Sequence, residues 1–195
     1  MSSTVAPERV ILSILDSVAR EHGRPIHRTE LVKLVYFVDY IYAQHTGRTL
    51  TGFHYVWDNY GPNAAHNDIV KTSDVLSLRG LVRVQESLTP FGNSKFLYAL
   101  EDSVQVEPLP DELGQRIMAE VVAKYGNVGW KEIVKASKRT KPFKKARPGD
   151  ELDLSPSPQV DRVLRLVTTR VRDGSYEDEG EGVSIEELKA RYGLS

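Results

Sequence analysis

Apolar residues recur at helical spacing along most of this chain, and they predict a mainly helical protein. Between Pro7 and His22 they fall on one face, and Gly23 follows as a left-handed helix stop. A second helix is predicted from Arg28 to His45. Aromatic side chains widen its aliphatic face until the helix is apolar on almost every side. A helix of this kind is normally central and buried.

The segment that follows this helix is aromatic and extended. Residues 49–57 alternate aromatic with polar side chains, which predicts a strand. Pro62 is expected to open a helix over residues 62–71, because proline is favourable at the first helical position. Ser73 is expected to cap a further short helix over residues 74–79.

Two β-prone runs come next. Residues 81–84 and 96–100 are rich in branched and aromatic residues, and Gly92-Asn93 between them is a turn signal. They predict a β-hairpin that follows two short helices, which is the order of a winged-helix module. We therefore expect a mainly α fold with a small β-hairpin (α+β): a compact helical domain with a central buried helix and a winged-helix-like hairpin.

Two more helices are predicted after the hairpin. Asp111 is expected to cap a helix that continues to Tyr125, and Asn127 to open another. Residues 140–156 are polar and irregular, which predicts a loop. Residues 1–156 are accordingly expected to form one domain.

A C-terminal helical extension is predicted for residues 157–195. It begins with an amphipathic helix whose apolar stripe lies within residues 158–172 and continues through an acidic, glycine-rich linker at 173–183. A short helix from Ser184 to Tyr192 follows. The stripe offers a surface for dimerisation, so a scaffold that forms a homo-oligomer stays an open alternative.

The composition is that of an ordinary globular protein. Of the 195 residues, 40% are hydrophobic and 27% are charged, and the formal net charge is −1. The chain as a whole therefore does not attract nucleic acid or anionic membrane. It has no cysteine, which excludes disulfides and thiolate metal sites and is typical of a reducing compartment. Because we find no signal peptide and no bilayer-spanning apolar run, we expect a cytoplasmic protein without membrane partners.

Catalytic and metal-binding patterns are missing from the sequence. Its five histidines form no paired ligand motif, and no cysteine accompanies them. It contains no Gly-x-Ser-x-Gly nucleophile turn and no glycine-rich phosphate loop. We therefore expect no catalytic residues, no metal, no cofactor and no enzymatic activity.

Residues 131–147 form a basic run that is opposed only by Glu132. Three interpretations stay open: a solvated face, a docking surface for an acidic partner or nucleic acid, or a partner in cis for the acidic residues 177–181. The cations that form the candidate basic patch are Lys135, Lys138, Arg139, Lys141, Lys144 and Lys145.

The most specific pattern lies in residues 31–62. Its motifs are Lys33-Leu34-Val35-Tyr36-Phe37 on the helix, the turn from Gly47 to Gly52, and Tyr60-Gly61-Pro62. In this order they resemble the Panacea antitoxin domain of the SocA-like family. Asn63-Ala64-Ala65 departs from the family, which usually continues with valine and a further proline.

A weaker match follows later in the chain. Trp130 and the run Thr140-Lys141-Pro142-Phe143 resemble the later segment of the same family, with Phe143 in place of the usual tryptophan. With this segment the resemblance covers roughly residues 8–155.

The resemblance implies a non-enzymatic antitoxin that binds and neutralises a cognate protein toxin, usually encoded by the adjacent gene. The toxin's identity stays open, and the resemblance also allows a protease-adaptor role, because some SocA-like members deliver a partner to a protease. Aromatic side chains dominate interface energetics. The candidate partner-binding residues are therefore Tyr36, Tyr40, Phe53, Trp57 and Tyr60.

A winged-helix DNA-binding regulator is the alternative function, on account of the predicted hairpin. Its candidate recognition elements carry four cations against three carboxylates: Lys71, Arg79, Arg83 and Lys95 against Asp68, Asp74 and Glu86. This balance gives weak attraction to phosphates, so nucleic acid is possible as a partner but not favoured.

Overall fold

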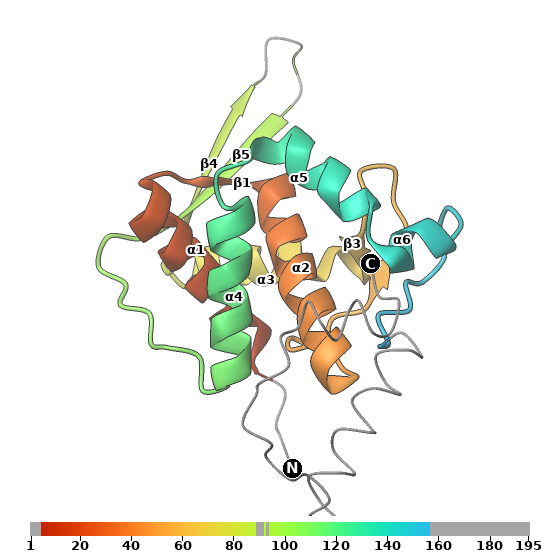
Figure 1. Ribbon diagram of the computed structural model, residues 1–195. Coiled ribbons are helices and arrows are strands. Elements are labelled where there is room, and N and C mark those ends of the chain that lie inside the picture. The colour runs from red at the N-terminus through yellow and green to blue at the C-terminus, as the bar shows by residue number, and fades with distance from the viewer. Residues whose placement is uncertain (1–4, 89–91, 93, 157–195) are drawn as a thin grey trace, which may run out of the picture. The chain divides into compact units, whose positions relative to one another are not determined.

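Helix α2 (Arg28–Thr46) is the centre of the part of the chain that the computed structural model describes, residues 5–88, 92 and 94–156. The helices beside it in Figure 1 are α1 (Pro7–His22), α4 (Glu112–Tyr125) and α5 (Gly129–Lys138). Residues 30–39 of α2 are all buried, so the helix meets protein on every side. The expected central buried helix is confirmed.

The ends of α1 and α2 follow from their sequences. Gly23 and Gly47 close the two helices in the left-handed conformation, and each donates its N–H to a carbonyl of the last turn. At the start of α2, the His27 ring accepts a backbone N–H while the Glu30 carboxylate accepts the N–H of His27. This capping box satisfies donors that the first helical turn leaves open.

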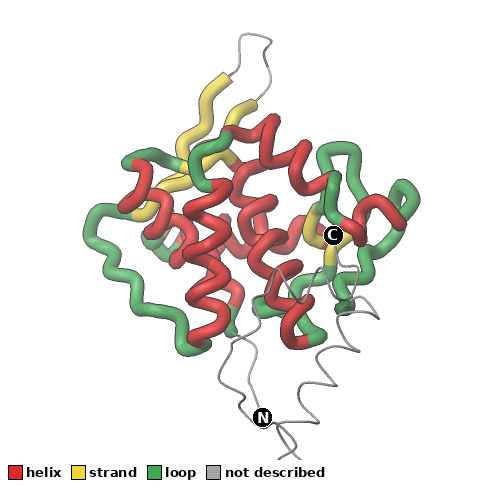
Figure 2. The backbone as a smooth tube through the Cα atoms, viewed as in Figure 1, coloured by secondary structure: helices red, strands yellow, loops and turns green. Residues whose placement is uncertain are grey.

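The predicted hairpin is present and is part of a three-stranded sheet. Strands β4 (Val82–Leu88) and β5 (Ser94–Leu100) pair antiparallel over their full lengths. Strand β1 (Ile26–His27) adds to the far side of β5, which gives the order β1-β5-β4. Figure 2 shows these strands at one edge of the helices. A two-residue strand is too short for a hydrophobic alternation, so the sequence pattern did not predict β1.

The two helices predicted for residues 62–71 and 74–79 are wrong, whereas the strand predicted for residues 49–57 is present only near its end. Pro62 opens no helix; it precedes β3 (Asn63–Ala64), which pairs with β2 (Tyr55–Val56). A 3₁₀ turn follows, and then one continuous helix, α3 (Asp68–Leu78). Ser73 caps nothing, because its hydroxyl donates to the Ile69 carbonyl four residues back.

The hairpin is therefore preceded by α2 and α3, and not by two short helices. On α3, Asp74 and Lys71 are exposed and Asp68 is partly so. The opposed charges give this helix little attraction for a phosphate backbone.

The helices after the hairpin agree better with expectation. Asp111 caps α4, and its carboxylate accepts the N–H of Gly114 at 2.6 Å. Helix α5 begins two residues later than predicted. The expected loop at 140–156 contains one further helix, α6 (Lys141–Lys145), because Pro142 in its first turn is buried and fixes the backbone there.

Some expectations lie outside the described residues. These are the turn residue Asn93, the amphipathic stripe at 158–172, the acidic linker at 173–183, its proposed pairing in cis and the helix from Ser184 to Tyr192. Among the helices that are described, none has the length and apolar character needed to cross a membrane.

A buried carboxyl joins α2 to the segment that follows it. Asp39 is fully buried and accepts hydrogen bonds from the Thr51 N–H at 2.9 Å, the Thr51 hydroxyl at 2.5 Å and the Tyr55 hydroxyl at 2.7 Å. Burial raises the pKa of Asp39 to about 6, although these donors act in the opposite direction. The folded state thus holds the proton of Asp39 more tightly than the unfolded chain.

The stability of the fold should therefore depend on pH through Asp39. Between pH ~4 and ~6 the unfolded chain ionises this carboxyl first, so the free energy of unfolding should fall by ~3 kcal/mol as the pH rises. Asp39→Asn should lack this dependence, because its amide does not titrate. Urea unfolding of both proteins at several pH values measures the difference. If the free energy of unfolding depended on pH in the same way for both proteins, Asp39 would not be the source of the dependence.

Candidate functional site

The loop Tyr60-Gly61-Pro62 is fixed to α2 and α5. The Lys33 ammonium donates to the Pro62 carbonyl at 2.6 Å. Within the loop, the Asp58 carboxylate accepts the Tyr60 N–H at 2.8 Å, and the Gly61 N–H donates to the Asp58 carbonyl at 2.9 Å. The loop is thus held both by its own hydrogen bonds and by a side chain of the central helix.

Gly61 is required at its position for two reasons. Its φ is +88°, which only glycine adopts without strain. In addition, a Cβ atom there would lie 2.6 Å from the Ser137 hydroxyl of α5. The glycine therefore lets the loop pack directly on α5.

A second link ties α2 to the end of α5. The Tyr36 hydroxyl and the Thr140 hydroxyl lie 2.7 Å apart, and Thr140 donates to the Ser137 carbonyl. Tyr36 is fully buried, and burial raises the pKa of its hydroxyl. It lies in the core, where a partner cannot reach it, so this candidate contact residue instead stabilises the interior.

A third contact joins the strand before the loop to α6. The Trp57 and Phe143 rings stack with centroids 5.0 Å apart and planes at 14°. Phe143 and Pro142 are buried. The backbone N–H of Trp57 donates to the backbone carbonyl of Asp150. The phenylalanine that replaces the usual tryptophan thus provides a flat ring against which Trp57 packs.

Of the five candidate aromatics, Tyr60 is the one that is largely exposed, at 64%. Tyr40 is partly buried and stacks on Tyr36, with centroids 5.9 Å apart. Phe53 and Trp57 are also partly buried and pack on the core. The structure therefore does not bring the five together as one exposed surface, and Tyr60 is the one whose ring is mostly accessible.

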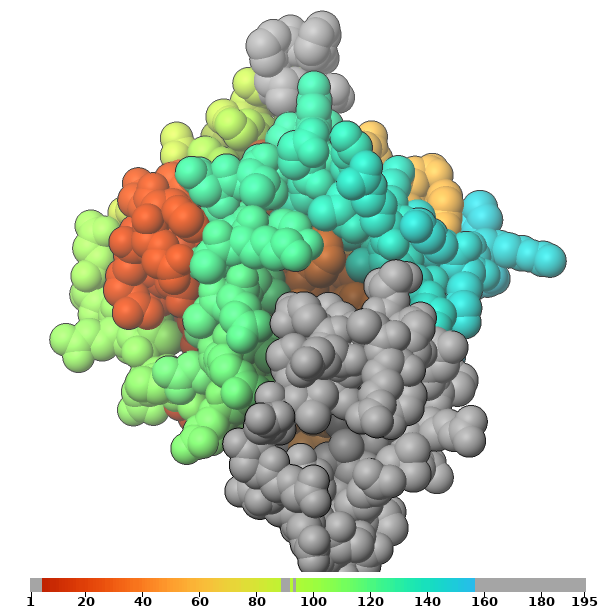
Figure 3. Space-filling view, in the orientation of Figure 1, coloured from red at the N-terminus to blue at the C-terminus, as the bar shows by residue number. Residues whose placement is uncertain are grey.

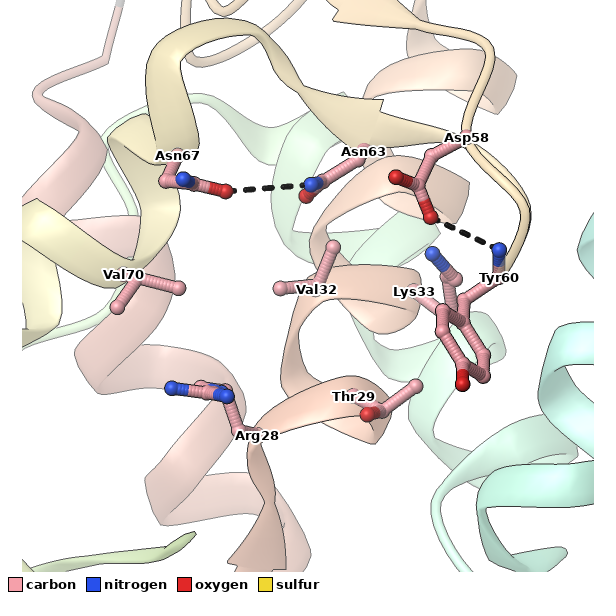
Figure 4. Close-up of a pocket in the computed structure, with 9 residues that line it drawn as sticks. All are labelled: Arg28, Thr29, Val32, Lys33, Asp58, Tyr60, Asn63, Asn67 and Val70. Atoms are coloured by element: carbon pink, nitrogen blue, oxygen red, sulfur yellow. Dashed lines mark hydrogen bonds between the residues drawn. The ribbon is translucent and has the colours of Figure 1, made fainter. Parts of the chain in front are cut away.

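An open pocket of about 320 Å³ lies next to Tyr60 (Figure 4). It is formed by the first turns of α2, the Asp58–Tyr60 turn, β3 and the start of α3. Its lining residues are Arg28, Thr29, Val32, Lys33, Asp58, Tyr60, Asn63, Asn67 and Val70.

The rim of this pocket holds an unusual backbone. His66 and Asn67 both have positive φ, at +56° and +57°, although neither is glycine. The Asn63 amide donates to the Asn67 side-chain oxygen at 3.2 Å. Two consecutive residues in this conformation are costly, and such strain is concentrated at functional sites.

Lys33 lines the pocket beside Asp58 and Tyr60 (Figure 4), with only 2% of its surface exposed. Burial lowers the pKa of its ammonium to about 8. In the sequence it was a motif residue without an assigned role. The available signal was a lysine inside an otherwise apolar helix, because such a lysine needs a reason to be buried.

The cations of the basic patch lie on α5, on α6 and at Arg139 between them. Figure 3 shows the surface that this part of the chain forms. Lys135, Arg139 and the three lysines of residues 141–145 are exposed, while Lys138 is partly buried beside Gly61. Trp130 is exposed at 41%. The patch thus begins next to the Tyr60 loop.

The remaining motif residues have structural positions. Leu34 is buried in the core, and Gly47 and Gly52 have φ of +78° and +80°. Within the described ranges, no group of His, Cys, Asp and Glu side chains is arranged to hold a metal ion.

Comparison with known families gives a match over much of the chain. The model of the family described as "Antitoxin SocA-like, Panacea domain" matches residues 31–144, which is more than half of the chain. The match begins within α2 and ends within α6. No match was found among curated proteins or among solved structures.

Gly61→Ala should destabilise the fold more than the same substitution at a glycine that has a similar φ but no close neighbours. The positive φ alone costs an alanine ~1–2 kcal/mol, and at Gly61 the contact with Ser137 adds to this cost. Gly149→Ala is the matched control, because Gly149 has φ +86° and a Cβ atom at that position would meet no other atom within 4 Å. Urea unfolding should show the larger loss for Gly61→Ala, with partial recovery in a Gly61→Ala/Ser137→Ala double variant. Equal losses at the two glycines would contradict the packing argument.

Proposed function

This chain belongs to the antitoxin SocA-like, Panacea domain family, and on that premise we propose that it binds and neutralises a cognate protein toxin. The family implies a toxin as the partner. Neutralisation through direct protein–protein contact, with no catalytic step by the antitoxin, is the mechanism that we propose for this chain.

The observation that carries the proposal is the exposed ring of Tyr60 on a fixed loop. Tyrosine and tryptophan are enriched among the residues that dominate binding energy. Because Asp58, Gly61 and the Lys33 bond hold the loop, ordering it on binding costs little conformational entropy. An exposed aromatic in a preorganised loop is thus well suited to anchor a partner.

The residues around Tyr60 also support a role for this part of the surface in binding the partner. On one side lies the pocket between α2 and α3, and on the other lies Lys138 at the edge of the basic patch. Beneath the surface, the bond between Tyr36 and Thr140 holds the end of α5, on which Gly61 packs. The proposed contact surface therefore consists of Tyr60, the pocket and the adjoining end of α5.

Co-expression of this chain with the adjacent gene tests the proposed function. If the product of that gene is a toxin, it should arrest growth alone, and this chain should restore growth. The purified pair should also form a complex by calorimetry. Arrested growth that persists with this chain present and folded would contradict the proposal.

Tyr60→Ala should weaken toxin binding by about thirtyfold, which corresponds to the loss of a hot-spot residue of ~2 kcal/mol. Leu78→Ala is the matched control, because Leu78 is 89% exposed at the far end of α3. Both variants should have the same midpoint of urea unfolding as the wild type, since neither side chain is in the core. Calorimetric titration with the toxin measures the effect, and wild-type affinity for Tyr60→Ala would remove this residue from the interface.

A further inference from the structure

Helix α5 carries a row of cations on the face that it turns to solvent. Lys131, Lys135 and Lys138 are separated by four and then three residues, so they follow one another along one face of the helix. Arg139 continues the row where the helix ends. Lys138 is partly buried and the other three are exposed, whereas Ile133 on the opposite side is fully buried. These four cationic side chains are called the α5 row below.

The α5 row has no salt bridge within the described part of the chain. No carboxylate of that part lies within 4.0 Å of its side-chain nitrogens. Glu132 borders the row on the same helix, but it too lies beyond this distance. The surface of α5 is therefore locally positive, although the net charge of the chain is −1.

The stability of α5 itself explains only part of the row. Cations in the last helical turn are favourable because of the helix dipole, which accounts for Lys135 and Lys138. Lys131 lies in the first turn, where the dipole disfavours a cation, and one turn before Lys135, which repels it. Its ammonium lies 5.6 Å from the centroid of the Trp130 ring, a weak contact at an exposed site. Lys131 thus adds little to the stability of its own helix.

An exposed aromatic residue lies at each end of the α5 row. Trp130 precedes Lys131 and is 41% exposed. The loop that carries Tyr60 packs at the other end, because a Cβ atom at Gly61 would lie 3.5 Å from the Cγ atom of Lys138. In protein interfaces tyrosine and tryptophan are enriched and lysine is depleted from the core, so cations belong to the polar rim. This composition is typical of a protein interface with aromatic anchors and charges beside them.

The α5 row is short for a nucleic-acid site. From Lys131 to Lys138 the helix rises by ~10 Å, whereas a protein bound to duplex DNA through its backbone can contact ~6–10 phosphates. The basic run continues into α6, but three carboxylates follow it within residues 150–153. The negative net charge of the chain also gives no long-range attraction for a polyanion. An acidic patch on a protein surface fits a row of this length better.

We propose that the α5 row docks an acidic patch of the toxin, a surface cluster of aspartate and glutamate side chains, while Tyr60 anchors the adjoining part of the interface. This inference rests on the proposed function and specifies the chemistry of the partner. Charges at the rim of an interface act mainly on the rate of association, because they steer the two proteins before short-range contacts form. The α5 row should therefore speed up association, whereas Tyr60 should slow dissociation.

The double variant Lys131→Gln/Lys135→Gln tests the proposal, with Arg79→Gln/Arg116→Gln as the matched control. Each double variant loses two positive charges from exposed positions, so the net charge of the chain changes equally in both. The control cations lie at the end of α3 and on α4, not on α5. Glutamine has a helix propensity close to that of lysine and arginine. Both variants should therefore keep the wild-type midpoint of urea unfolding.

Association and dissociation rates with the purified product of the adjacent gene should separate the two variants. In ~20 mM NaCl, Lys131→Gln/Lys135→Gln should associate about tenfold more slowly than the control, with a similar dissociation rate. In ~1 M NaCl the difference should nearly vanish, because charges are then screened within ~3 Å. Tyr60→Ala should show the opposite pattern, with faster dissociation and little change in association. Stopped-flow fluorescence measures both rates for the full-length proteins.

Charge exchange then identifies the acidic patch. Lys135→Glu should associate with the toxin more slowly than Lys135→Gln does, because it repels the patch. The exposed aspartates and glutamates of the toxin are changed singly to lysine. At least one of these changes should slow association with the wild type and speed up association with Lys135→Glu, which is the signature of a direct interaction.

The inference is overturned, with the proposed function intact, if the toxin binds the wild type but associates equally fast with the two double variants at low salt. It is also overturned if Lys131→Gln/Lys135→Gln weakens binding to random duplex DNA or single-stranded RNA and leaves association with the toxin unchanged. If the product of the adjacent gene does not bind the wild type at either salt concentration, both the inference and the proposed function are wrong.

Discussion

The structure depends on how the central helix α2 buries polar side chains inside the core. Lys33, Tyr36 and Asp39 are three residues apart on α2, so they lie on one face. Each must find a partner in the interior, and each finds it in a different segment: the Pro62 carbonyl, the Thr140 hydroxyl, and Thr51 with Tyr55. An unpaired buried polar group would cost ~1–3 kcal/mol. The need to satisfy these groups determines where the loop, the end of α5 and the strand β2 lie.

The elements that a hydrophobic period specifies were predictable. Helices α1 and α2, the hairpin and the Asp111 cap follow from local spacing and local caps, since these interactions occur within a few residues. The region from Asn63 to Leu78 was not predictable in this way. Pro62 is compatible with the first turn of a helix, but its carbonyl is bonded by a lysine 29 residues earlier and the next residues pair with β2. Tertiary contacts thus override the local preference of the proline.

The candidate site was predicted in composition but not in geometry. An aromatic segment that ends in Tyr60-Gly61-Pro62 pointed to the region that contains the loop and the pocket described above. Aromatic character alone could not separate the fully buried Tyr36 from the exposed Tyr60, because both are compatible with core and with interface. The pocket was not visible in the sequence at all, since its walls come from four elements between Arg28 and Val70. Two features of the sequence are related to the pocket. One is Lys33 within a largely apolar helix, and the other is the pair His66-Asn67, which takes positive φ in a stretch without glycine.

The hydrogen bond between Tyr36 and Thr140 has a consequence for the order in which the molecule is built. The two residues are 104 positions apart, and contacts of such high sequence separation form late, because a long loop must close before they contribute. During synthesis, α1 and α2 leave the ribosome long before the segment that contains Ser137 and Thr140. The Tyr60 loop therefore cannot pack on α5 until the second half of the domain has been synthesised. A nascent chain of this protein should complete the proposed contact surface at a late step of folding, after its central helix has already formed.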